Sequence, residues 1–76
     1  MLIASQVRMA RAALGISVRE LSTQTGVGDS TILRFESGKG GILAANLERL
    51  KIALEAGGVI FFPADAHGGP GVRFRQ

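Results

Sequence analysis

The feature that most constrains this chain is a pair of short helical patterns joined by a glycine turn, over residues 14–36. Leu21 lies one turn into the first pattern, and Gly26 can adopt the left-handed backbone conformation that a sharp turn requires. Ile32 and Phe35 recur at helical spacing in the second pattern and should face back toward Leu21. The spacing predicts a helix-turn-helix motif in which the other face of the second helix stays free.

Two helices are expected before the turn at Gly26. Apolar residues at helical spacing, together with abundant alanine, predict a first helix over residues 4–14 that ends at Gly15. The N-cap of this helix is not evident. Ser17 and Glu20 have the spacing of a capping box, so a second helix should begin there and end at Gly26.

Two more helices are expected after the turn. The third should run over residues 29–36, with Asp29 in its first turn, where a negative charge suits the helix dipole. Leucines at helical spacing predict a fourth helix over residues 44–56, which the Gly57-Gly58 pair ends.

The C-terminal tail has the composition of strands. Residues 59–62 are β-branched or aromatic and are followed by Pro63, and residues 72–75 alternate with period two. These patterns predict two short strands around the glycine-rich loop 64–71.

The length and composition describe one small domain. With 76 residues, a single core is only just sufficient, and a second chain often adds the missing stability. The absence of cysteine and the single histidine exclude a disulfide framework and a zinc ligand cluster. The net charge of +3 favours an anionic partner. We therefore expect a dimer with no metal or other cofactor.

Two broad classes of function are disfavoured. No apolar run approaches the length of a membrane span, and Arg8 and Arg11 interrupt the N-terminus before a secretory signal could form, so we expect a cytoplasmic protein with no membrane contact. An enzyme is not expected either. The chain has no cysteine nucleophile, and its lone His67 lies in a glycine-rich loop with only Asp65 nearby.

A specific combined pattern extends over residues 4–56. It is carried by Arg11, Leu14, Gly15, Ser17, Glu20, Leu21, Thr25, Gly26, Val27, Thr31, Ile32, Arg34, Glu36, Ser37, Gly38 and Lys39. With these residues the chain resembles the phage-repressor-like regulators of the Cro and C1 type, also called the xenobiotic-response-element (XRE) family. The resemblance implies a mainly α fold, a four-helix lambda-repressor-like DNA-binding domain with a short C-terminal β-strand or hairpin. Residues 1–57 would form the DNA-binding domain and residues 58–76 a β tail for dimerisation.

The resemblance also implies that the third helix enters the major groove of DNA by its N-terminal part. Asp29, Ser30 and Arg34 are then the candidates for base contact. Arg34 is the strongest candidate, because a planar guanidinium can bond O6 and N7 of guanine together, and its alternative role is a phosphate clamp. Asp29 could accept from cytosine N4 or orient Arg34, and it could equally serve only the helix cap.

The candidates for phosphate contact lie mainly at helix ends and in the loop after the third helix, where amides and short donors hold the backbone of a duplex. Val18 stands where the family often has a glutamine, so only its backbone amide could serve. Arg19 could instead be a solvated surface charge. The full set is Ser17, Val18, Arg19, Thr31, Ser37 and Lys39.

Arg11 and Glu36 have a different role by resemblance. They should form a partly buried ion pair that joins the first helix to the end of the third and holds the DNA-reading helix in place. Ser22 replaces the usual small apolar residue where the two helices of the motif touch. Its hydroxyl is expected to bond back into its own helix.

The tail predicts a contact between subunits. Residues 56–64 carry no charge, and as an exposed strand this run would be an aggregation hazard. The alternative to a subunit contact is a hairpin folded over the fourth helix of its own chain in a monomer. We expect pairing with the equivalent strand or hairpin of a second subunit, through Val59, Ile60, Phe61, Phe62, Val72 and Phe74.

Together these patterns predict a sequence-specific DNA-binding transcriptional regulator. It should be a repressor that binds a palindromic operator as a homodimer, through the helix at residues 29–36. The alternative is a protein-binding module, such as the antitoxin of a toxin–antitoxin pair, that uses the hydrophobic tail to bind a protein partner. A regulator should be a stable homodimer alone, whereas a partner-binding module should aggregate or stay monomeric.

Overall fold

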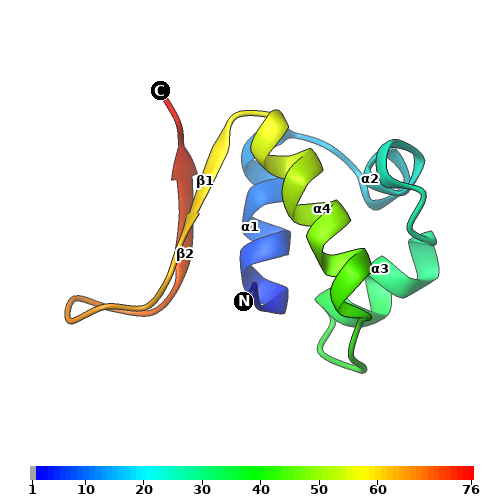
Figure 1. Ribbon diagram of the computed structural model, residues 1–76, viewed down its shortest axis with the longest axis horizontal. Coiled ribbons are helices and arrows are strands. Elements are labelled where there is room, and N and C mark those ends of the chain that lie inside the picture. The colour runs from blue at the N-terminus through cyan, green and yellow to red at the C-terminus, as the bar shows by residue number, and fades with distance from the viewer. Residues whose placement is uncertain (1) are drawn as a thin grey trace.

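The computed structural model describes residues 2–76, over which the chain forms four helices and then a two-stranded antiparallel hairpin (Figure 1). This architecture confirms the predicted mainly α fold with a C-terminal hairpin. The elements are α1 (Ala4–Leu14), α2 (Val18–Thr25), α3 (Asp29–Glu36), α4 (Ala44–Ala56), β1 (Val59–Phe62) and β2 (Gly71–Phe74).

The helix ends follow local signals in the sequence. The Oγ of Ser17 accepts a hydrogen bond from the Glu20 amide at 3.0 Å, and the Glu20 carboxylate accepts one from the Ser17 amide at 3.2 Å. The predicted capping box at the start of α2 is therefore confirmed. The N-cap residue of α1 is Ile3, which has no side chain that could cap the helix, but its own amide donates to Gln6 Oε1 at 3.0 Å.

Two hydroxyl groups close the turn between α2 and α3. Gly26 has φ 76°, the left-handed conformation that favours glycine, and the side chain of Val27 is buried. Ser22 Oγ donates to the Val27 carbonyl at 2.6 Å, so the expected bond within its own helix is wrong, because the turn brings this carbonyl within reach. Thr25 Oγ1 donates to the Leu21 carbonyl at 2.7 Å and accepts from the Val27 amide at 3.2 Å.

One core joins all four helices to the hairpin. α1 and α4 lie at the centre of the molecule, with α2 and α3 on one side and the hairpin on the other (Figure 1). The largest fully buried side chains come from every helix and from β1, and they are Val7, Leu21, Ile32, Leu50, Leu54 and Val59. The α2–α3 pair and the hairpin are therefore two separate surfaces of one packed unit.

The hairpin confirms the two predicted strands and fixes their register within one chain. Phe61 pairs with Val72 and both pack against the core, whereas the neighbouring pair, Phe62 and Gly71, lies on the outer face. β2 runs from Gly71 to Phe74, one residue earlier than predicted. The ring of Phe62 covers Gly71 so closely that an added Cβ would lie 2.6 Å from Phe62 Cζ.

A buried glutamine that the sequence analysis did not single out fastens the hairpin to α1. Gln6 is 2% exposed, and its Nε2 donates to the carbonyls of Phe62 and Gly71, each at 3.1 Å. Those carbonyls belong to the paired ends of β1 and β2. One side chain therefore satisfies the Ile3 amide and one carbonyl of each strand.

Gln6→Leu keeps much of the side-chain volume but removes all three hydrogen bonds. Because buried backbone groups are left without partners, we expect the free energy of unfolding to fall by about 2–4 kcal/mol, measured by urea denaturation. Gln24→Leu is the matched control, since Gln24 is exposed on α2, and should change stability by less than about 0.5 kcal/mol. Equal effects of the two variants would contradict the role given to Gln6.

Candidate nucleic-acid interface

α3 has one buried face and one free face. Ile32 is fully buried and Phe35 packs against the core, which confirms the predicted core face of this helix. Asp29, Ser30 and Arg34 are exposed. The three predicted base-contact residues therefore lie on the part of α3 that a duplex could approach.

Three predicted phosphate contacts lie close to Arg34. Ser37 Oγ donates to the Arg34 carbonyl at 3.0 Å and the Lys39 amide donates to the same carbonyl at 3.1 Å, while both of these residues are exposed. Thr31 is half-buried and lines, with Arg34, an open recess of about 430 Å³. The recess extends to Asn46 in the first turn of α4, a polar residue that no motif in the sequence marked.

The other predicted phosphate contacts lie at the start of α2. Ser17 and Arg19 are exposed, whereas the side chain of Val18 packs against the core, so a contact there would use the backbone amide. The Ser17 oxygen accepts a bond in the capping box, which leaves its proton available to donate. The amides of a helix N-terminus carry partial positive charge and suit a phosphate group.

Arg11 and Glu36 form a bidentate ion pair between α1 and the last residue of α3. Arg11 Nε lies 2.8 Å from Glu36 Oε2, and Arg11 Nη2 lies 2.7 Å from Glu36 Oε1. The Glu36 side chain is 3% exposed and that of Arg11 is 22% exposed, so solvent screens the pair weakly. Hydrogen bonding to Glu36 raises the pKa of the Arg11 guanidinium above its ordinary value, against burial, which lowers it.

Two further bonds extend this contact between α1 and α3. Arg11 Nη1 donates to the Ile16 carbonyl at 3.1 Å, and the Arg8 guanidinium donates to the backbone carbonyl of Glu36. No motif in the sequence indicated a structural role for Arg8. Its bond satisfies one of the carbonyls that a helix leaves free at its C-terminus. Both the side chain and the backbone of Glu36 therefore hold the end of α3 to α1.

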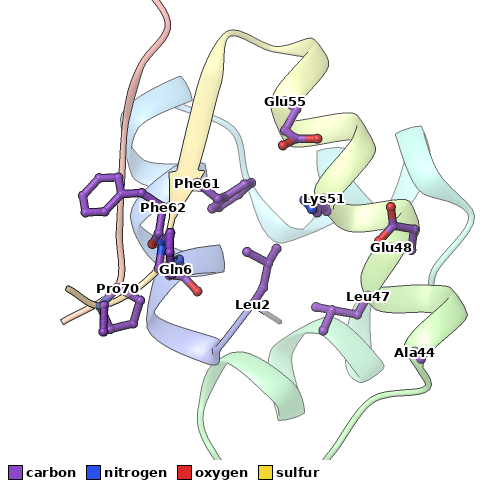
Figure 2. Close-up of a pocket in the computed structure, with 12 residues that line it drawn as sticks. Leu2, Gln6, Ala44, Leu47, Glu48, Lys51, Glu55, Phe61, Phe62 and Pro70 are labelled. Atoms are coloured by element: carbon purple, nitrogen blue, oxygen red, sulfur yellow. Dashed lines mark hydrogen bonds between the residues drawn. The ribbon is translucent and has the colours of Figure 1, made fainter.

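A second recess lies on the hairpin side of the molecule (Figure 2). It has a volume of about 500 Å³ and lies between the start of α1, one face of α4 and the end of β1. Leu2, Leu47 and Phe61 line it together with the charged side chains of Glu48 and Lys51. None of the predicted DNA-contact residues lies in this recess, so it is separate from the candidate interface.

The part of the chain that the structure describes contains neither a cluster of metal-binding side chains nor a helix suited to cross a membrane. Among residues 2–76, no three side chains of His, Cys, Asp or Glu come together as a metal site. In the same range, no helix combines the length and the apolar character needed to cross a membrane.

Comparison with known proteins agrees with this geometry. The sequence profile of the helix-turn-helix family matches residues 7–59, a span that includes all of α2, α3 and α4. The chain belongs to the helix-turn-helix family of the XRE, or Cro/C1, type. This helix-turn-helix protein is therefore a DNA-binding transcription regulator. A search among curated proteins found no match.

In this helix-turn-helix regulator, the contribution of Arg11 to the free energy of unfolding should depend on the presence of Glu36, and that of Glu36 on Arg11. Arg11→Met leaves the Glu36 carboxylate buried without its cation, so we expect the free energy of unfolding to fall by about 2–4 kcal/mol. Glu36→Gln removes the charge and keeps an acceptor, so it should cost less. In urea denaturation, the double variant should lose clearly less than the sum of the two single variants. Additive losses would show that the two side chains do not stabilise the fold as a pair.

Proposed function

We propose that this helix-turn-helix regulator is a sequence-specific repressor that binds a palindromic operator as a homodimer, with α3 of each subunit in the major groove. The observation that carries the proposal is the free face of α3. There the Arg34 guanidinium makes no hydrogen bond or ion pair with any of residues 2–76, and Asp29 and Ser30 are exposed on the same helix. Base readout needs such unpaired polar groups on a firmly held helix.

Base contact is assigned to the first turn of α3, through Asp29 and Ser30, and to Arg34 in its last turn. Arg34 can donate to O6 and N7 of guanine at once, a contact worth about 1–3 kcal/mol of discrimination. Asp29 suits cytosine N4 or the orientation of Arg34, and Ser30 can either donate or accept. The Arg11–Glu36 ion pair supports this assignment, because it holds the C-terminal end of α3 in place without using the exposed side chains.

Phosphate contact is assigned to the start of α2 and to the surface around Arg34. These groups would fix the position of the protein on the duplex and read no sequence. They are the side chains of Ser17, Arg19, Thr31, Ser37 and Lys39 and the backbone amide of Val18. A dimer held in this way on two half-sites would cover the major groove and exclude polymerase, which favours repression. A cytoplasmic location stays a prediction.

Selection of bound duplexes from a random pool at physiological salt tests the proposed operator binding. We expect a palindrome whose half-sites lie about one helical turn apart. Arg34→Ala should then lose discrimination at one base pair of each half-site, whereas Lys39→Ala should weaken binding to all sequences alike and flatten the salt dependence. If the pool yields no enriched sequence, or if Arg34→Ala weakens every sequence equally, base readout by α3 is wrong.

Part of the hairpin stays available for the proposed homodimer. Of the six predicted dimerisation residues, three pack into or against the core of their own chain: Val59, Phe61 and Val72. Ile60 and Phe62 are only half-buried, and Phe74 is 57% exposed. A two-stranded sheet also leaves strand edges open. Ile60 and Phe62 lie on the outer face, where Arg73 also lies over the Phe62 ring, whereas Phe74 pairs with Val59 at the exposed end of the core-side face. A symmetric contact would cover the outer face through Ile60 and Phe62, and the exposed end of β2 through Phe74.

Ile60→Thr tests the proposed dimer contact with a small change in volume. We expect it to lower the mass found by light scattering toward that of a monomer, because a polar group enters the contact. Ile52→Thr is the matched control, since Ile52 is 58% exposed on α4, outside the hairpin, and should leave the mass unchanged. Dissociation by Ile52→Thr but not by Ile60→Thr would place the contact on α4 instead.

The antitoxin alternative uses the same hydrophobic tail and stays a prediction. The two hypotheses differ in the oligomeric state and the DNA binding that they predict for the chain without a partner. A protein that is monomeric or aggregated without a partner, and that enriches no duplex, would favour a partner-binding module over the regulator proposed above.

A further inference from the structure

The loop after α3 folds back against the helix it leaves. Gly38 has φ 76°, a left-handed conformation that reverses the chain, and the Lys39 amide then bonds to the Arg34 carbonyl at 3.1 Å. This reversal places Gly40 beside the side chain of Arg34. The residue proposed to read a base is therefore in contact with the loop that follows its own helix.

A side chain at position 40 would lie tightly against Arg34. A Cβ added there would lie 3.1 Å from both Cδ and Nε of Arg34 and 3.2 Å from its Cγ. Favourable contacts between carbon atoms lie at about 3.5–4.0 Å, so the Arg34 side chain would have to move by a few tenths of an ångström to admit a Cβ, and further for a larger side chain. The φ of Gly40 is not positive, which means that the backbone itself does not require glycine. The requirement comes from the Arg34 side chain alone.

The Arg34 side chain has both a close neighbour and open space beside it. Its stem lies beside the bare backbone of Gly40, and the residue also lines the open recess of about 430 Å³, together with Thr31, Gly41 and Asn46. Open space next to Arg34 lets its side chain move when a side chain is added at position 40. The fold need not change, because only a flexible side chain has to move.

We infer that Gly40 is a positioning residue for base readout: its bare backbone sets the direction in which Arg34 extends. The inference rests on the proposed function, in which Arg34 contacts a base. Bidentate bonding to guanine needs both donors in one plane at fixed positions, so a displaced stem weakens discrimination although the charge is unchanged. A bidentate contact of this kind discriminates by about 5- to 150-fold.

Gly41 provides the matched control. A Cβ at Gly41 would meet nothing within 4 Å, and its φ is not positive either. If the loop glycines served only as flexible spacers, substitutions at Gly40 and Gly41 would have similar effects. If Gly40 acts through Arg34, only the substitution at position 40 should alter sequence discrimination.

The experiment compares Gly40→Val and Gly41→Val, each alone and combined with Arg34→Ala. The probes are the duplex that the wild-type protein selects and its three variants at the base pair whose discrimination depends on Arg34. Gly40→Val should lower discrimination at that pair about fivefold or more, and Gly41→Val should leave it unchanged. In the Arg34→Ala background, Gly40→Val should have no further effect. Thermal unfolding checks that each variant is folded. If Gly40→Val is not folded, the milder variant Gly40→Ala takes its place.

A second readout needs no DNA. The NMR signal of the Arg34 Nε–Hε group, assigned from its loss in Arg34→Ala, should shift in Gly40→Val and stay in place in Gly41→Val. If Gly40→Val keeps full discrimination at this base pair while Arg34→Ala loses it, the inference about Gly40 is overturned and the proposed function still stands. Unchanged discrimination by Arg34→Ala, or no selected duplex at all, would remove both.

Discussion

The structure depends on the contact between Glu36 and α1. A carboxylate that is 3% exposed is costly to bury unless a cation and hydrogen bonds satisfy it. Arg11 supplies two of those bonds, and Arg8 bonds to the backbone carbonyl of the same residue. Because α3 has only 8 residues and would not be stable alone, this contact fixes how the helix is presented.

The same contact decides which side chains of α3 stay free. Ile32 and the Glu36 carboxylate face the rest of the fold, so the exposed residues include Asp29, Ser30 and Arg34. On the far side of α1, Gln6 holds the hairpin by both strands. The two surfaces lie on opposite sides of the α1–α4 pair (Figure 1). DNA binding by α3 and assembly through the hairpin would therefore not compete for the same surface.

Much of the fold could be predicted because its signals are local. The capping box of Ser17 and Glu20, the glycine at position 26 and the leucine spacing of α4 each depend on neighbours within a few residues. The start of β2 was missed by one residue, because it is set by the pairing of Gly71 with Phe62 on the other strand.

Two kinds of contact could not be predicted. One kind joins residues that are far apart in the sequence, and the other forms only inside the folded turn. Gln6 reads as a polar residue of an amphipathic helix, and only the docked hairpin gives it carbonyls to bond. The Ser22 hydroxyl has an ordinary acceptor in its own helix, yet the folded turn offers the Val27 carbonyl instead. The candidate base-contact residues were predicted by resemblance, whereas the close approach of Gly40 to Arg34 needs the path of the loop in space.

The central claim is that the exposed face of α3 contacts DNA. NMR titration of the ¹⁵N-labelled protein with the selected duplex tests it most directly. We expect the amide signals of residues 29–34, and those of residues 17–19 and 37–39, to shift on binding, together with the Arg34 Nε–Hε signal. The signals of residues on the outer face of β1 and β2 should change little. Shifts confined to the hairpin, with α3 unaffected, would show that α3 does not contact DNA.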